Sequence, residues 1–448
     1  MSIKPVLAVM LMMAVVLPAR ALPAIESWTS ADGARVLYVH APEIPMVDVE
    51  LVFDAGAARD GDLDGLARMV NSLLEEGADG LDADAIATGF EDLGAVTGFS
   101  SQRDMASVSL RSLSAADKLA PASALLARLV ARPDFPATAV ERIRNQLQSA
   151  LMQTRQSPGE LANRAFYEAL YPDHPYGAHP GGTEASLERI TQDTLKAFHD
   201  RYYVAANAVV AVVGDIGRAD AETLVDELLA DLPRGERAPP PEGPGTTAGA
   251  ALLVPYPAEQ VHLLMGQRGM RRGDPDYFPL YLGNHILGGS GLVSRLSKAV
   301  REERGLSYSV SSRFIPMRGE GPFKLSLQTK SANAGEAVAV VGQVLEEFVA
   351  EGPAADELRA AKDNIINGFP LRVDSNAKIG SYLVMMGFYD LPLDYLNTFT
   401  ARVEDVTAAQ VRDAFARRVD PRAFVKVLAG DLDDAQREAL GLVVRDVE

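Results

Sequence analysis

The chain has 448 residues, 47% of them hydrophobic, so it is long enough to build more than one hydrophobic core. Its 61 acidic and 43 basic residues give a formal net charge of −18, which argues against nucleic acid or an anionic membrane as a partner. The sequence contains no cysteine, which excludes disulfides, a thiolate nucleophile and a cysteine metal site.

The N-terminus has the features of an export signal. Lys4 precedes the apolar run VLAVMLMMAVVLP, and Ala19 and Ala21 are small residues at the two positions that a signal peptidase reads. The run is shorter than the roughly 20 residues of a membrane-spanning helix, so an uncleaved anchor is the weaker alternative. We expect cleavage before Leu22 and a soluble, periplasmic mature protein.

Two strands are expected within residues 34–56, and an amphipathic helix follows at residues 65–78, GLARMVNSLLEEGA. The polar face of this helix carries Arg68, Asn71 and Ser72 at positions i, i+3 and i+4. An H-x-x-E-H helix places two metal ligands and a general base at this spacing. The sequence therefore raises the question of a metal site whose ligands have been replaced.

Histidines do not point to another metal site. His174 and His179 lie in the proline- and glycine-rich stretch YPDHPYGAHPGG, which favours a loop with a structural role. His199 is expected to be a partly exposed helix residue. No two histidines are four residues apart, so a zinc site would need scattered side chains.

The stretch PRGERAPPPEGPGTTAG, residues 233–249, is the clearest linker, because its prolines and glycines interrupt both helix and strand. Residues 190–215 and 406–431 each read as a helix, a turn and a strand that ends in Gly-Asp. This repetition predicts two duplicated α+β domains. The expected division is a signal peptide at 1–21, a first domain at 22–232, the linker at 233–249 and a second domain at 250–448.

The second domain contains a glycine turn, Gly288-Gly289-Ser290-Gly291, which has few β-carbons and lets a peptide backbone approach closely. Ser290 lacks the G-x-S-x-G spacing of a catalytic serine, and no base is assigned to it.

A helix is expected from about Leu292 to Gly305, followed by a strand from about Leu306. Arg301 near the helix end and Tyr308 early in the strand are expected to point into one cleft. There the guanidinium and the hydroxyl can donate to a carbonyl or carboxylate. The alternative is a helix-end arginine and a half-buried strand tyrosine without a chemical role.

The block LGGSGLVSRLSKAVREERGLSYSVSS, the HPYG turn and the paired Gly-Asp strand ends resemble the insulinase/pitrilysin family of peptidases, in particular its short members of the mitochondrial-processing-peptidase type. The resemblance runs from about Ile25 to Asp431. It implies two homologous α+β domains, each a mostly antiparallel sheet packed with helices, which enclose a peptide-binding cavity.

Members of that family bind zinc through H-x-x-E-H and a glutamate further along the chain. The matching helix here carries Arg68, Asn71 and Ser72, and the downstream window of residues 145–158 has no acidic residue. Zinc needs about three protein ligands and a base to activate its water. The resemblance therefore implies a degenerate site without metal in the first domain, and no cofactor in this chain.

Arg301 and Tyr308 match the pair that binds the substrate backbone and polarises the scissile carbonyl in that family. The glycine loop Gly288 to Gly291 precedes them, and Ser100 and Ser101 lie in the matching edge strand, to which a peptide can add. In some bacterial members one subunit carries the zinc and the other carries the Arg/Tyr pair.

The resemblance favours a non-catalytic, substrate-binding subunit of a heterodimeric periplasmic zinc metallopeptidase. It would be inactive alone and would pair with a homologous H-x-x-E-H subunit to bind unfolded peptides. The alternative is a stand-alone peptide-binding or chaperone-like protein without protease activity. The net charge adds one hint, that an acidic cavity wall would favour basic peptides.

Overall fold

The computed structural model describes residues 24–245 and 248–447, which form two halves with one six-stranded sheet each. The expected signal peptide, residues 1–21, lies outside the described residues. Between the halves, residues 233–245 and 248–250 contain no helix or strand. No helix in the described ranges combines the length and apolarity needed to cross a membrane.

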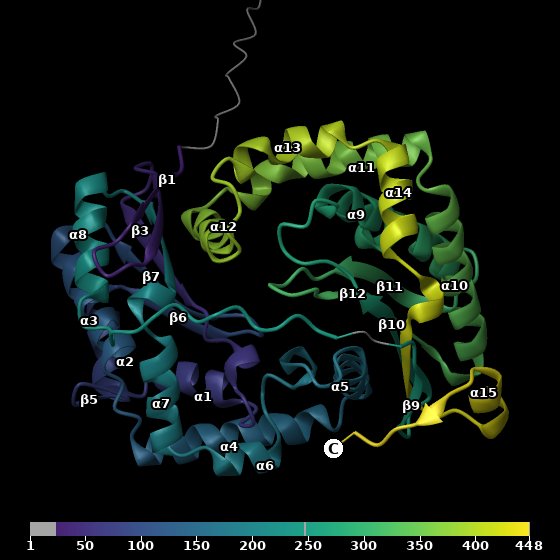
Figure 1. Cartoon of the computed structure of the whole chain (residues 1–448), viewed down its shortest axis with the longest axis horizontal. Coiled ribbons are helices and arrows are strands. Elements are labelled where there is room, and N and C mark those ends of the chain that lie inside the picture. Colours follow the sequence, from purple (N-terminus) through teal and green to yellow (C-terminus); the bar gives the residue numbers. More distant parts are fainter. Residues whose placement is uncertain (1–23, 246–247, 448) are drawn as a thin grey trace, which may run out of the picture.

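The first half follows the expected order of strands and helices (Figure 1). Its elements are β1 (Glu26–Thr29), β2 (Arg35–His40), β3 (Met46–Phe53), α1 (Leu66–Leu73), β4 (Gly77–Ala78), β5 (Leu81–Asp82), α2 (Ala83–Leu93), β6 (Val96–Ser101), β7 (Ala106–Leu113), α3 (Ala116–Ala131), α4 (Ala137–Thr154), α5 (Pro158–Leu170), α6 (Glu184–Arg189), α7 (Gln192–Tyr202), β8 (Ala208–Gly214) and α8 (Arg218–Leu229).

The second half repeats much of this order. Its elements are β9 (Ala251–Pro255), β10 (Gln260–Arg268), α9 (Tyr277–Asn284), two π-helical turns (His285–Gly289 and Ser297–Glu302), β11 (Ser307–Phe314), β12 (Pro322–Lys330), α10 (Ala334–Glu351), α11 (Ala355–Gly368), α12 (Asn376–Phe388), α13 (Tyr395–Asp405), α14 (Ala408–Arg418), β13 (Val425–Gly430), α15 (Asp434–Ala439) and β14 (Val443–Val444).

The two sheets share a five-stranded topology and differ at one edge, where β1 pairs antiparallel with β2 but β14 pairs parallel with β9. The first has the order β1-β2-β8-β3-β7-β6 and the second β11-β12-β10-β13-β9-β14. Strand β8 pairs parallel with β2, and β13 pairs parallel with β9, whereas the strands from β8 to β6 and from β13 to β11 are antiparallel. The prediction of duplicated, mostly antiparallel α+β domains is therefore confirmed.

Each half lends one helix to the sheet of the other. Helix α12 of the second half packs on β2, β3 and β8, and helix α5 of the first half packs on β9, β10 and β13. Both helices lie near the middle of the molecule in Figure 1. The opposite face of each sheet is covered mainly by helices of its own half.

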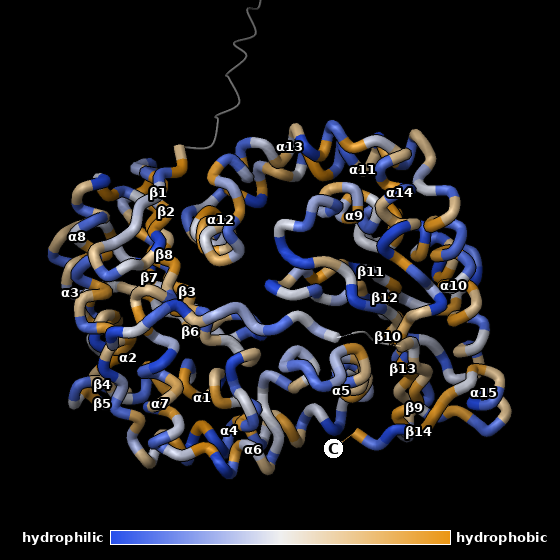
Figure 2. The backbone as a smooth tube through the Cα atoms, viewed as in Figure 1, coloured by the Kyte–Doolittle hydropathy of each residue, from blue (hydrophilic) through white to orange (hydrophobic). Residues whose placement is uncertain are grey.

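The hydrophobic residues follow this layering. One core lies under the first sheet and its own helices, a second joins the helices of the second half to the α12 face of the first sheet, and a third surrounds α5. Outer helices such as α4 and α13 alternate hydrophilic and hydrophobic residues along the chain (Figure 2), as expected for helices with one face toward a core.

Candidate functional site

Helix α1 forms where the apolar spacing predicts it. Gly65 adopts the left-handed conformation (φ 94°) just before the helix. The buried Asp60 carboxylate accepts hydrogen bonds from the backbone N–H groups of Gly65 (2.8 Å) and Ala67 (2.7 Å). These contacts satisfy N–H groups that a helix N-terminus leaves unpaired. The position of α1 is therefore fixed by an apolar face and a buried carboxylate cap.

The polar face of α1 has neither a histidine nor a carboxylate at the three matching positions. Asn71 is only 2% exposed, and its Nδ2 donates to the Ser107 carbonyl oxygen of β7 at 3.2 Å. Arg68 is exposed and Ser72 is half-buried. Among the described residues, no group of three histidine, aspartate or glutamate side chains is arranged to hold a metal ion. The residue at the general-base position is thus a structural amide that joins α1 to the sheet.

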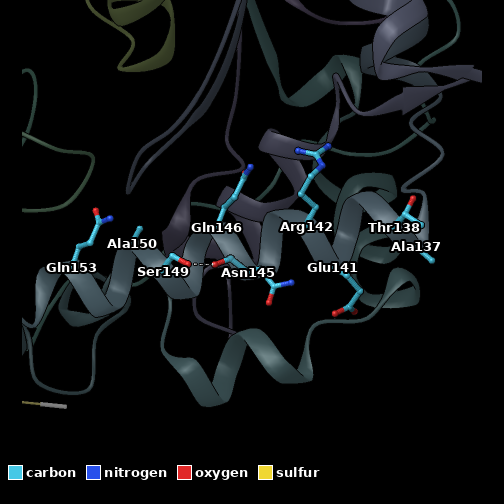
Figure 3. A pocket seen from close by; sticks show the side chains of 9 residues that line it. All are labelled: Ala137, Thr138, Glu141, Arg142, Asn145, Gln146, Ser149, Ala150 and Gln153. Carbon is cyan, nitrogen blue, oxygen red and sulfur yellow. Dashed lines mark hydrogen bonds between the residues drawn. The ribbon is translucent and has the colours of Figure 1, made fainter.

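Helix α4, which packs against α1, borders an open cavity of about 880 Å³ (Figure 3). In the window of residues 145–158, Asn145, Gln146, Ser149, Ala150 and Gln153 line it. The acid in its lining is Glu141, which pairs with Arg144 on the same helix. Arg142 extends from α4 to an ion pair with Glu76, just beyond α1. In this window the groove is therefore lined by amides, a hydroxyl and a methyl group, without a carboxylate.

Strand β6 forms the edge of the first sheet, pairing with β7 in the described part of the chain. The Ser100 hydroxyl lies 2.7 Å from that of Ser107, and the buried Ser101 hydroxyl has no partner among the described residues. A cavity of about 460 Å³ runs between this edge and α12, with Ser100, Glu50 and Ser381 in its lining. Burial raises the pKa of the Glu50 carboxyl.

The glycine loop is tightly packed at its start. A β-carbon on Gly288 would lie 2.4 Å from the Ser312 hydroxyl, and one on Gly289 would lie 2.8 Å from Asn284 Nδ2. Both glycines are therefore required by packing within the chain. Gly291 has φ 66° and open space around the position of its missing side chain, so another backbone can approach closely there.

Arg301 and Tyr308 lie on adjacent segments beside this loop. The Gly305 N–H donates to the Arg301 carbonyl at 3.0 Å, which brings the π-helical turn of Arg301 next to β11. Arg301 is half-buried and Tyr308 is 88% exposed. Within the described residues, neither side chain forms a hydrogen bond or an ion pair, so both can donate to a ligand.

The helix expected from Leu292 is shorter than predicted. Residues 291–293 form a 3-10 turn, and helical structure resumes at Arg295. Ser294 explains the difference, because its hydroxyl accepts from the Ser297 N–H at 3.2 Å and donates to the Gly291 carbonyl. A serine in this position starts a helix, and this local signal was missed.

The histidines have structural roles. His199 is 3% exposed, so the prediction of a partly exposed residue is wrong: its Nε2 lies 2.8 Å from the Val130 carbonyl and its ring stacks on Tyr203. His174 accepts from the Tyr176 N–H at 3.1 Å through Nδ1. It therefore shapes the HPYG turn.

Sequence reasoning also missed a carboxylate that joins the two halves. Asp104, 5% exposed in the β6–β7 loop, accepts from the hydroxyls of Tyr176 (2.6 Å) and Tyr389 (2.9 Å) and from the Arg318 N–H (2.8 Å). Burial and the carboxylate together raise the pKa of Tyr176, which keeps its hydroxyl a donor. Three of these groups come from widely separated segments, so no local pattern could reveal the cluster.

Two family models match the chain in tandem. The model described as insulinase (peptidase family M16) matches residues 35–184, and the model described as peptidase M16 inactive domain matches residues 189–365. Together they cover most of both sheets and the degenerate zinc helix.

Solved structures agree with this assignment. The crystal structure of a peptidase M16 inactive domain from Pseudomonas fluorescens is similar with a TM-score of 0.89 and 41% identity, over 91% of this chain and 98% of that chain. A protease from Helicobacter pylori has the same fold, with a TM-score of 0.83 at 20% identity, over 92% of this chain and all of that one.

Curated relatives include proteins named as zinc proteases and a protein named as a non-peptidase homolog. An uncharacterized zinc protease of Mycobacterium leprae is 32% identical over 243 residues, which span 53% of this chain and about half (54%) of that protein. The non-peptidase homolog YmxG of Helicobacter pylori is 24% identical over 380 residues, or 84% of this chain and 87% of that protein.

Proposed function

Because the chain belongs to the insulinase (peptidase M16) family and is an inactive member of it, we propose that it is the non-catalytic, substrate-binding subunit of a heterodimeric zinc peptidase. A homologous partner with H-x-x-E-H would hold the zinc, and this chain would hold no cofactor. The export signal expected at residues 1–21 places the heterodimer in the periplasm. Alone, the chain would not cleave peptides.

One contrast within the molecule carries the proposal. At the former zinc site, Asn71 is buried and committed to a hydrogen bond with β7. In the second half, Arg301 and Tyr308 are accessible and make no hydrogen bond or ion pair with any described residue. Hydrogen-bond donors that reach a carbonyl oxygen stabilise the charge that develops on it. The chain has lost the metal chemistry and retains the groups that bind substrate.

Two surfaces beside these groups support the assignment. Leu292 (59% exposed) and Val293 (85% exposed) follow the glycine loop directly, and exposed apolar side chains that lie together favour contact with another chain. In the first half, the free edge of β6 at Ser100 and Ser101 offers backbone groups to an extended peptide.

The partner is tested by affinity purification of the tagged mature protein from its native periplasm, followed by mass spectrometry. We expect an equal amount of a similar-sized chain that carries H-x-x-E-H. Recovery of the protein alone, or only with itself, would contradict the heterodimer and leave a stand-alone peptide-binding protein.

The role of the Arg/Tyr pair is tested in the reconstituted heterodimer. Arg301→Ala and Tyr308→Phe should each lower kcat/KM for an unfolded peptide by about 100-fold, because each removes a donor to the carbonyl. Arg304→Ala is the matched control: Arg304 is exposed, lies three residues from Arg301, and its side chain contacts Ala299 and Glu303.

Unchanged kcat/KM in both variants would show that the pair has no part in catalysis. Chelator-sensitive peptide hydrolysis by the purified chain alone would overturn the assignment as a non-catalytic subunit.

A further inference from the structure

A group of cations surrounds Tyr167 on α5, where the first half covers the second sheet. The Arg103 guanidinium, from the β6–β7 loop, lies 3.8 Å from the centre of the Tyr167 ring, and Lys324 Nζ, from β12, lies 5.8 Å from it. The two cations therefore approach one ring from different halves of the chain.

A third cation lies beside Lys324. Arg313 on β11 is directly opposite Lys324 in the antiparallel register, and like charges in opposed positions repel each other. Lys324 Nζ donates to the Asn163 side-chain oxygen at 2.9 Å. Arg313 is exposed and also lines a cavity of about 420 Å³ together with Gly288 and Gly289. The cations thus reach the glycine loop.

The group extends in the other direction to the former zinc helix. Arg103 donates to the carbonyls of Tyr176 (3.0 Å) and Ala178 (3.4 Å). In the same loop, a β-carbon on Gly181 would lie 3.4 Å from Nη1 of Arg68. The intervening His179 adds no positive charge near neutral pH, because burial and neighbouring arginines lower its pKa to about 4.

We call these four cations the seam cluster. Asp104 attracts Arg103 and Glu160 attracts Lys324, but neither carboxylate forms an ion pair with its cation. Within the described part of the chain, Arg68, Arg103, Arg313 and Lys324 form no ion pair. The nearby Arg164 pairs with Glu168 on α5. Arg68 and Arg313 are exposed, whereas Arg103 and Lys324 are partly buried. Partly buried cations without an ion-pair partner are costly. A bound anion would offset that cost.

We propose that the seam cluster binds a carboxylate of the peptide, either an acidic side chain or the C-terminal carboxylate. The inference rests on the proposed function as a peptide-binding subunit and names its substrate class. A preference for carboxylates is the opposite of the preference for basic peptides that the net charge of the chain suggested. The carboxylate would bind beside Lys324 and Arg313, next to the cavity that Arg313 lines together with Gly288 and Gly289.

The two sources of the carboxylate are separated with fluorescently labelled, unstructured peptides and the mature protein, measured by anisotropy. The set contains a peptide with internal aspartates and an amidated C-terminus, a neutral peptide with a free C-terminus, and a neutral amidated peptide. At least one carboxylate-bearing peptide should bind about tenfold more tightly than the neutral amide, and the one that does identifies the source.

Two variants test whether the seam cluster causes the preference for carboxylate-bearing peptides. Lys324→Met and Arg313→Gln should each abolish this preference while the affinity for the neutral amide stays unchanged. Lys330→Met is the matched control, because Lys330 is exposed at the end of the same strand. Far-ultraviolet circular dichroism checks that each variant is folded.

A pH series adds a second readout. Burial, with Arg313 and Arg103 nearby, lowers the pKa of Lys324 to about 8, whereas Glu160 on α5 acts in the opposite direction. Tyr167 does not titrate in this range, because burial raises its pKa. The preference for the carboxylate should therefore decline as the pH rises above 8, and the Lys324→Met variant should show no such decline.

Equal binding of all three peptides, or a preference that survives both variants, would overturn the seam cluster as a carboxylate site and leave the proposed function standing. Failure of every peptide to bind, both to the mature protein and to its heterodimer, would overturn the proposed function as well.

Discussion

The two helices that cross between the halves occupy equivalent places in the duplicated fold, but the partly buried charge without an ion pair beside each helix has the opposite sign. Helix α12 lies beside Asp48 and Glu50 of β3, where Arg111 pairs with Asp48 at 2.8 Å and Glu50 has no ion pair with a described residue. Helix α5 lies beside Arg103 and Lys324. We call the interface of α12 with the first sheet the α12 seam, and that of α5 with the second sheet the α5 seam. Both halves keep the packing of a helix on a sheet, whereas the charges at the two seams differ.

The close contacts at the two seams also differ in which element provides the glycine. On the first sheet, the glycine belongs to the helix: a β-carbon on Gly387 of α12 would lie 2.4 Å from Val209 of β8. On the second sheet, it belongs to the strand: a β-carbon on Gly266 of β10 would lie 3.1 Å from the Phe166 ring of α5. In each case a glycine lies where the helix meets the sheet.

The largest change in the free energy of unfolding is expected at Asp104, whose carboxylate joins the two halves. Asp104→Ala removes a buried carboxylate and leaves two tyrosine hydroxyls and a backbone N–H without their acceptor, which should lower the free energy of unfolding by about 3 kcal/mol. Urea denaturation measures the change. A loss below about 1 kcal/mol would show that Asp104 is not a major link between the halves.

A smaller loss is expected at the α12 seam. Gly387→Ala places a methyl group against Val209 and Leu37 and should destabilise the protein by about 2 kcal/mol through overpacking. Gly342→Ala is the control: Gly342 is in the interior of α10 with open space around it, so alanine should stabilise by about 0.5–1 kcal/mol. Thermal unfolding should therefore shift in opposite directions in the two variants.

The α5 seam should gain stability when its buried charge is removed. Lys324→Met replaces a cation without an ion-pair partner by an apolar side chain of similar length, which should stabilise by about 1 kcal/mol at pH 7. In the wild type, the unfolded chain binds more protons than the folded one between pH 8 and the ordinary lysine pKa near 10.5, so stability should rise with pH in that window. The variant should lose this slope in urea denaturation at several pH values.

The α12 seam should show the opposite slope and the smallest effect. Burial raises the pKa of Glu50, so the folded protein binds more protons than the unfolded chain above the ordinary glutamate pKa of 4.5. Its contribution to stability should fall as the pH rises through that range. Glu50→Gln should flatten the slope, and the same slope in both seams would refute the charge difference between them.

Local patterns predicted much of the fold. The spacing of apolar residues predicted α1, the β-branched runs predicted β8 and β13, and the repeated Gly-Asp ends revealed the duplication. The start of the helix after the glycine loop was misplaced, because the Ser294 cap was overlooked. The burial of His199 was missed because it depends on Val130 and Tyr203, which a helical pattern does not reveal.

The sequence by itself predicted the two duplicated domains, because a repeated order of helix, turn and strand is visible along the chain. The degenerate zinc positions Arg68, Asn71 and Ser72 and the roles of Arg301 and Tyr308 follow from the resemblance and stay predictions. Only the tertiary structure decided that α5 and α12 exchange sheets, that Asp104 joins the halves, and that Arg103 and Lys324 meet around Tyr167. Periodicity records which face of an element is buried, whereas the choice of the covering element depends on how two distant segments pack together.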